Sequence, residues 1–155
     1  MLEDNTKYKV YFMEFLPYLK EDAIAAKTRY HDDKNNLFNA GYYCGYYKVM
    51  ALIMEVTEGL DVELVEWGRS GEDKLMHKND LEYKKYLIKL TPLLKEYALK
   101  AKEKYHNNKD NMFNSGYYCA FHGIMGLVML LTIGPDLDLK ELGLDNLDPD
   151  KDLIG

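Results

Sequence analysis

The sequence contains little cysteine and tryptophan, and it begins without an apolar run. Of its 155 residues, two are cysteine and one is tryptophan. Two cysteines do not provide the disulfide framework that is typical of small secreted proteins. The first residues, Met1–Asn5, include neither a basic stretch nor a hydrophobic segment, so we expect no secretory signal. These absences predict a cytoplasmic protein with reduced thiols.

Basic residues are in the minority as well. Lysine and arginine number 20 against 26 aspartate and glutamate residues, which gives a net charge of −6. This balance argues against binding to nucleic acid. Residues 136–155 hold seven acids and two bases, and residues 59–76 hold five acids and two bases. The acidity therefore belongs to two tail segments, and an acidic surface of this kind would favour a basic partner.

Common catalytic motifs are also missing. The chain has no glycine-rich phosphate loop, no nucleophile elbow and no His-Glu-x-x-His motif. We therefore expect no catalytic residue and no cofactor, and the sequence favours a protein that is not an enzyme.

The sequence does contain an internal repeat with an offset of 75 residues. Residues 30–31, Tyr-His, recur at 105–106, and residues 41–44, Gly-Tyr-Tyr-Cys, recur at 116–119. Repeated units of this kind stack and bury surface that neither unit could bury alone.

The repeat predicts a single domain over residues 1–155, in which residues 4–76 and 79–154 are two copies of one unit. In each copy apolar residues recur at steps of three and four along about 25 residues, which indicates an amphipathic helix. This first helix has an internal proline, Pro17 or Pro92, which we expect to kink it.

A second helix follows in each copy, roughly over Asn36–Glu58 and Asn111–Ile133, after a polar loop. Asn35 and Asp110 are the expected N-caps of these helices. A short helix is predicted in each acidic tail, over Val62–Trp67 and over Leu137–Leu142. The expected fold is all-α: a tandem duplication of a helical hairpin that forms a pseudo-two-fold four-helix bundle with kinked first helices and short acidic tails.

The most strongly repeated motif is Phe-Asn-(Ala/Ser)-Gly-Tyr-Tyr-Cys, and it has two interpretations. Mid-helix glycine usually reflects a steric need, so close helix packing is the favoured one. The alternative is a paired binding surface with Asn39 and Asn114 as polar anchors and Tyr43 and Tyr118 as aromatic walls. Successive tyrosines cannot all face the core, so some of them, with Tyr47 among the candidates, are expected at the surface or an interface.

The histidines and cysteines include the ligand types of a zinc site, namely His31, Cys44, His106 and Cys119. Their spacing argues against one, because each cysteine lies about two helical turns, or ~10 Å, from the loop that carries its histidine. We therefore expect no metal, buried thiols, and histidines near helix C-termini, where positive charge is favoured.

The two copies differ most on one face of the second helix. Lys48, Glu55 and Glu58 in the first copy are replaced by glycine or an apolar residue in the second. The result is an apolar stripe, hereafter the α-stripe, made of Gly123, Gly126, Leu130 and Ile133. Nearby His122 replaces Tyr47 and is the one histidine in an apolar helix.

Three kinds of cover for the α-stripe follow from the sequence. The leucines of an acidic tail could pack on it, a second copy of the chain could form a homodimer there, or a different protein could bind. A membrane span over Gly116–Pro135 has a suitable length. It is disfavoured because it includes His122, because its counterpart in the first copy is amphipathic, and because no second span exists.

The end of the chain resembles a set of short uncharacterised helical proteins from low-GC Gram-positive bacteria. The resemblance rests on residues 137–145, Leu-Asp-Leu-Lys-Glu-Leu-Gly-Leu-Asp, and on residues 147–153, Leu-Asp-Pro-Asp-Lys-Asp-Leu. It implies no activity for any residue. By analogy only, many small acidic helical proteins of such bacteria are antitoxins or immunity proteins.

The leading functional prediction is a non-catalytic cytoplasmic protein-binding module, such as an immunity or antitoxin-like inhibitor of a basic partner. One alternative is a structural or regulatory homo-oligomer that uses the α-stripe. Another is a small-ligand-binding bundle or an enzyme, with a pocket between the hairpins lined by Tyr43, Tyr118 and His122.

Overall fold

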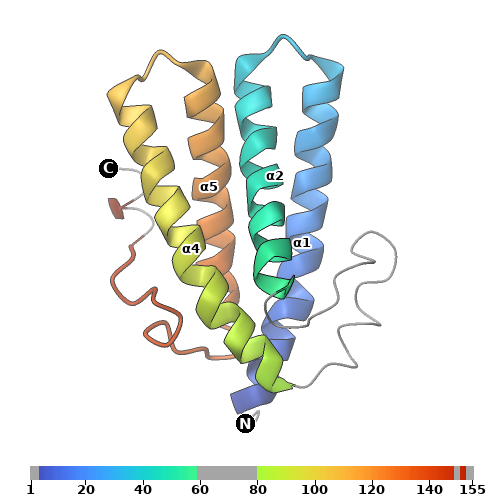
Figure 1. Ribbon diagram of the computed structural model, residues 1–155, viewed down its shortest axis with the longest axis vertical. Helices are drawn as coiled ribbons and strands as arrows, with labels where there is room; N and C mark the ends of the chain where they lie inside the picture. Colours follow the sequence, from blue (N-terminus) through green and yellow to red (C-terminus); the bar gives the residue numbers. More distant parts are fainter. Residues whose placement is uncertain (1–3, 59–79, 149–150, 153–155) are drawn as a thin grey trace.

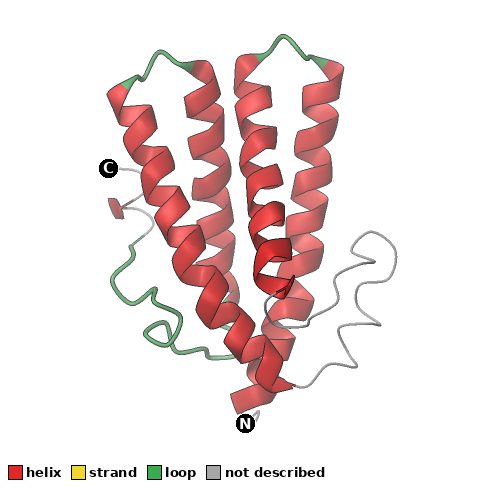
Figure 2. Cartoon of the chain, in the orientation of Figure 1, coloured by secondary structure: helices red, strands yellow, loops and turns green. Residues whose placement is uncertain are grey.

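The computed structural model describes residues 4–58, 80–148 and 151–152, and within them the chain is all-helical (Figures 1 and 2). The helices are α1 (Asp4–Asp32), α2 (Leu37–Glu58), α4 (Asp80–Asn107) and α5 (Met112–Leu131). No β-strand occurs in these ranges. The predicted all-α class is therefore confirmed.

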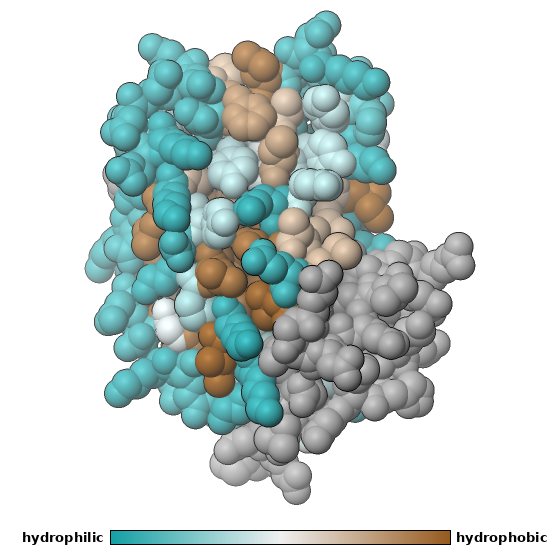
Figure 3. Space-filling model, viewed as in Figure 1, coloured by the Kyte–Doolittle hydropathy of each residue, from teal (hydrophilic) through white to brown (hydrophobic). Residues whose placement is uncertain are grey.

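The helices form two hairpins that stand side by side. Figure 1 shows the α1–α2 turn and the α4–α5 turn at the same end of the molecule, with α2 and α5 in the middle. The α2–α5 pair makes the most extensive helix–helix contact. On the face seen in Figure 3, hydrophobic side chains gather along the middle of the molecule between two hydrophilic flanks. The buried apolar residues come from all four helices, so the core lies between the hairpins.

The helix N-caps lie one residue later than predicted. The side chain of Asn36 accepts a hydrogen bond from the backbone N–H of Asn39 at 3.0 Å, and Asn111 accepts one from Asn114 at the same distance. Asparagine oxygens in this position satisfy amide groups that have no partner inside the helix. The prediction of Asn35 and Asp110 as caps was wrong. Each is followed by a second good capping residue, Asn36 or Asn111, and that residue caps the helix.

Two other predicted boundaries were also wrong. Helix α5 ends at Leu131 and is capped by Thr132, so Ile133 lies just beyond it. Residues 137–142 form turns rather than a short helix. Their leucines are spaced so that several are buried at once against neighbouring helices, and this tertiary packing outweighs the local preference. The companion prediction at Val62–Trp67 lies outside the described residues.

Helices α2 and α5 approach closely at two glycines. A methyl group added to Gly41 would overlap the carbonyl oxygen of Phe113, and one added to Gly116 would overlap the carbonyl oxygen of Phe38. The two contacts are reciprocal across the repeat, because Gly116 is the counterpart of Gly41 and Phe113 is the counterpart of Phe38, each 75 positions later. The repeated glycine is therefore required by close packing, as the favoured interpretation of the motif predicts.

Two buried tyrosines also join the hairpins across the core. The hydroxyl of Tyr11 donates to the carbonyl of Val128 at 2.9 Å, and that of Tyr86 donates to the carbonyl of Ile53 at 3.0 Å. Burial raises the pKa of both tyrosines well above the ordinary value, so both remain donors at neutral pH. The two hydrogen bonds again differ by 75 positions in donor and in acceptor.

Candidate binding surfaces

The α-stripe is largely open to solvent. Leu130 is 62% exposed and Ile133 is 73% exposed, although Met125 on the same helix is fully buried. Gly123 is exposed and Gly126 is half-buried. The stripe therefore begins on the outer side of α5 and continues past the helix C-cap to Ile133.

Among the residues that the structure describes, no contact requires a glycine at Gly123 or Gly126. A methyl group added to Gly126 would meet nothing within 4 Å, and one added to Gly123 would meet only the Tyr46 hydroxyl at 3.9 Å. At Gly41 and Gly116, by contrast, an added methyl group would overlap the backbone of the neighbouring helix. A mid-helix glycine costs up to about 1 kcal/mol relative to alanine. Because glycine has no side chain, the two open glycines leave a flat strip that another helix could approach closely.

The segment after α5 does not cover the α-stripe. In Figure 1 it runs along the outer side of α4. The leucines that it buries are Leu137, Leu142, Leu144 and Leu147. The hydroxyl of Thr91 donates to the carbonyl of Leu142 at 2.6 Å, and the ammonium of Lys95 donates to the carbonyl of Gly143 at 3.4 Å. The leucines of this tail are thus used on α4, while Leu130 and Ile133 remain exposed.

Exposed carboxylates follow the α-stripe in the chain. Asp136 comes three residues after Ile133, and Asp138 and Asp145 are also exposed. Of the nearby acids, Glu141 is used within the fold, where it accepts a hydrogen bond from Tyr8 at 2.5 Å. The apolar stripe therefore ends beside an acidic segment.

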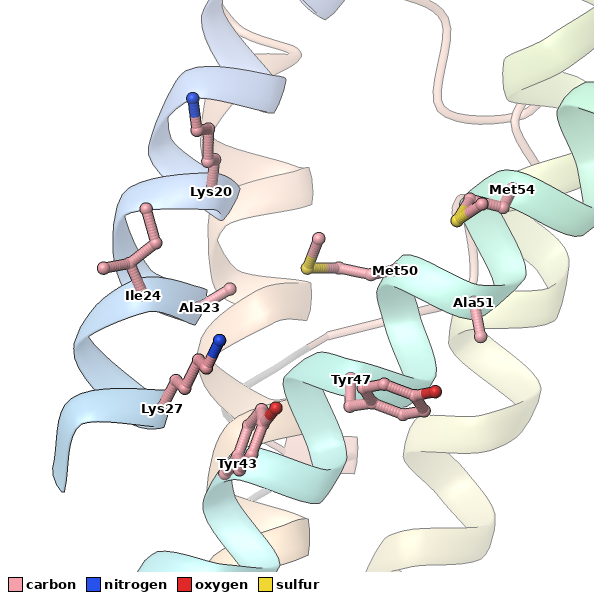
Figure 4. Close-up of a pocket in the computed structure, with 9 residues that line it drawn as sticks. All are labelled: Lys20, Ala23, Ile24, Lys27, Tyr43, Tyr47, Met50, Ala51 and Met54. Carbon is pink, nitrogen blue, oxygen red and sulfur yellow. The ribbon is translucent and has the colours of Figure 1, made fainter. Parts of the chain in front are cut away.

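A groove of about 480 Å3 lies on the first hairpin, between α1 and α2 (Figure 4). Lys20, Ala23, Ile24 and Lys27 line it from α1; Tyr43, Tyr47, Met50, Ala51 and Met54 line it from α2. The walls are apolar apart from the two lysines and the tyrosine hydroxyls. Tyr118 and His122 are not among the lining residues, so this groove belongs to one hairpin rather than to the space between the two.

Tyr118 and His122 belong instead to an aromatic cluster on the second hairpin. The ring of Tyr118 stacks on that of Tyr105 with centroids 5.0 Å apart and an interplanar angle of 7°. The rings of His106 and His122 lie 6.5 Å and 6.3 Å from that of Tyr118. The Nε2 atoms of both histidines are buried and have no hydrogen-bond partner within the described residues. The cluster holds the two helices together by ring contacts.

The first hairpin has a related but looser cluster. Tyr43 contacts the rings of Tyr30 and Tyr47, with centroids 5.5 Å and 6.4 Å apart. Tyr47 is exposed, as expected for a surface tyrosine, and His31 is exposed in the last turn of α1. The histidines were expected in loops. Both helices instead extend far enough to include them, so His31 and His106 lie in the last turns of α1 and α4.

The cysteines are exposed rather than buried. Cys44 and Cys119 both reach the surface and are free thiols, so the expectation of buried thiols was wrong. Each cysteine follows the two tyrosines of the repeated motif. It lies on the side of its helix that faces away from the core. Partial burial raises the pKa of Cys119. Within the described ranges no group of three or more His, Cys, Asp or Glu residues could hold a metal ion.

Asn39 and Asn114, predicted as polar anchors, are both half-buried at the start of their helices. Their backbone N–H groups donate to the capping side-chain oxygens of Asn36 and Asn111. These bonds use the main chain of Asn39 and Asn114 and assign no role to their side chains.

The groove on the first hairpin was not predicted from the sequence, although a signal was present. Lys20, Lys27, Met50 and Met54 all have identical residues 75 positions later. A groove lined mainly by residues that the two copies share cannot be recognised from the positions where the copies differ. No helix in the described part of the chain is apolar enough over sufficient length to cross a membrane.

The surfaces described above therefore carry the functional assignment, since the chain matches no protein-family model, no curated protein and no solved structure.

Proposed function

We propose that the chain is a tandem duplication of one helical hairpin that serves as a non-catalytic protein-binding module. The binding surface is the α-stripe together with the carboxylates that follow it. The observation that supports this most directly is the exposure of Leu130 and Ile133 after four tail leucines have been buried elsewhere. Exposed adjacent apolar groups of this kind commonly mark interaction sites.

The chemistry of the surface supports one kind of partner. Gly123 and Gly126 leave room for the backbone of an incoming helix, and Leu130 and Ile133 offer apolar contacts. Asp136 and Asp138 lie at the edge, where charges steer association more than they strengthen it. The fitting partner is a basic protein with an apolar helix face, as expected for the target of a cytoplasmic immunity or antitoxin-like inhibitor.

Affinity capture from an extract of the source cells, followed by titration with the purified protein, tests this proposal. We expect a partner that wild type retains and that Leu130→Glu binds at least about tenfold more weakly, a loss of ~1.4 kcal/mol. Met54→Glu is a matched control, because Met54 is 61% exposed and lies in the groove of the first hairpin. Equal binding by Leu130→Glu and wild type would show that the α-stripe is not the binding surface.

A homodimer through the same stripe is the second candidate. The open strip at Gly123 and Gly126 favours it, because it would let two copies of α5 pack at short distance. Light scattering separates the two candidates. A dimer that becomes a folded monomer in Leu130→Glu supports self-association, whereas a wild-type protein that is monomeric at all concentrations excludes it.

A further inference from the structure

The groove between α1 and α2 has a counterpart on the second hairpin, at positions 75 residues later in the chain. Six of its nine lining residues recur there with the same residue type, as Lys95, Ala98, Lys102, Tyr118, Met125 and Met129. The segment that follows α5 contacts both lysines of this set. The ammonium of Lys95 donates to the carbonyl of Gly143 at 3.4 Å, and that of Lys102 donates to the carbonyl of Asp152 at 2.5 Å. On the second hairpin these lysines therefore bind the main chain of a peptide segment.

The repeated positions are more buried on the second hairpin than on the first. Met125 is fully buried, whereas its counterpart Met50 is only half-buried. Lys102 is half-buried, whereas its counterpart Lys27 is exposed. Within the part of the chain that the structure describes, α1 and α2 alone line the first groove. The first groove thus presents to a ligand the same side chains that the second hairpin uses on its own tail.

The tail between the two lysine contacts shows which chemistry these side chains accept. Residues 143–152 have the sequence Gly-Leu-Asp-Asn-Leu-Asp-Pro-Asp-Lys-Asp, with two leucines, four acids and one base. Leu144 and Leu147 are both buried and belong to the hydrophobic core. The segment is therefore bound through its carbonyl groups and its leucines, and its charge is opposite to that of the lysines.

We propose that the groove between α1 and α2 binds an acidic, leucine-bearing segment of a partner protein, with Lys20 and Lys27 donating to its main-chain carbonyls. These two lysines are seven residues apart on α1, as Lys95 and Lys102 are on α4. Seven residues correspond to about 10 Å along a helix. A segment whose carbonyls match one pair of lysines therefore matches the other pair.

The first groove complements such a segment in charge and in polarity. Lys20 and Lys27 are the charged residues among its described lining residues, which include no carboxylate. Ile24, which is 55% exposed, and the half-buried Met50 offer apolar contacts for leucines. Figure 4 shows the lysines on the α1 side of the groove, with Tyr43 and Met50 on the α2 side. Opposite charges across such a contact favour association with an acidic segment and disfavour a basic one.

The tail of a second copy fits this groove less well than a segment of a different protein. Its tether to α5 keeps the tail at a roughly millimolar effective concentration beside its own groove. Leu144 and Leu147 are buried there and would have to be released before the tail could reach another molecule. Leu16 also replaces Thr91, whose hydroxyl donates to the carbonyl of Leu142, so the tail would lose that hydrogen bond on the first hairpin.

Fluorescence anisotropy of a labelled peptide with the sequence of residues 143–152, titrated with the full chain, tests this proposal. We expect saturable binding of one peptide per chain. Ile24→Glu and Lys20→Glu each place a negative charge in the groove, so each should weaken binding at least about tenfold. Leu99→Glu is the matched control, because Leu99 is the counterpart of Ile24 on the hairpin that the tail already covers, and it should leave the affinity unchanged. Circular dichroism checks that every variant retains its helices.

A second peptide, in which both leucines are replaced by serine, tests the apolar part of the contact. It should bind at least about tenfold more weakly than the first peptide. Equal binding of the two peptides would reduce the contact to charge alone and would overturn the proposal.

Three results with the first peptide would also overturn it. The first is a wild-type chain that shows no saturable binding. The second is binding that Ile24→Glu leaves unchanged or that Leu99→Glu weakens equally, because the peptide would then exchange with the tail on the second hairpin. The third is self-association of the chain that Ile24→Glu abolishes, which would assign the groove to a second copy. Leu130→Glu should bind the peptide as wild type does, so a failure of the α-stripe as a binding surface is distinguishable from a failure of this groove.

Discussion

Replacing Gly116 by alanine should destabilise the protein strongly, because the added methyl group would overlap the carbonyl oxygen of Phe38. The obstacle is backbone, which cannot move aside as a flexible side chain can, so α2 and α5 must separate. Overpacking of a tight contact costs about 1–3 kcal/mol and sometimes more. The midpoint of urea denaturation should fall accordingly, and Gly41→Ala should behave in the same way because it meets Phe113.

Gly126→Ala provides the matched control on the same helix. Nothing lies within 4 Å of the added methyl group, and alanine is the better helix former, so stability should rise by up to about 1 kcal/mol. If Gly116→Ala and Gly126→Ala changed stability in the same direction, the close approach of α2 and α5 would be wrong.

Leu142→Ala should release the segment that follows α5. Leu142 is fully buried, its carbonyl accepts from Thr91, and it belongs to the group of tail leucines that pack on the helices. Truncating a buried leucine costs about 2–5 kcal/mol. The expected result is a lower unfolding midpoint together with faster proteolytic cleavage in residues 136–148, before α4 and α5 are cut.

Ile133→Ala serves as its control, because Ile133 is 73% exposed and a change there should stay within about 0.5 kcal/mol. Cleavage in residues 136–148 that is no faster in Leu142→Ala than in Ile133→Ala would mean that the tail is not held by its leucines.

The helices could be predicted from the sequence because their signals are local and strong. Apolar residues at steps of three and four continue through Pro17 and Pro92. Helices α1 and α4 likewise continue through these prolines. Glycine in the repeated motif predicted close packing, because a glycine inside a helix usually has a steric reason. The ends of the helices were less certain, since adjacent residues such as Asn35 and Asn36 can both serve as caps.

The candidate surfaces could be predicted only in part. The α-stripe was found because three charged residues in one copy become apolar or glycine in the other, which is visible in sequence. Whether the tail would cover it depended on tertiary packing: the tail leucines lie on α4, at Thr91 and Lys95, rather than on the outer side of α5. The groove on the first hairpin was not predicted, because its walls come from two helices and form only when α1 and α2 pack together.

Hydrogen exchange of the protein with and without its captured partner tests the central claim most directly. The account predicts that the partner slows exchange of the amides in residues 123–133, while those of α1 beside the groove are unchanged. Protection of this stretch should be absent in Leu130→Glu and present in Met54→Glu. Exchange in residues 123–133 that is the same with and without the partner would contradict the claim that the α-stripe is the working surface of this protein.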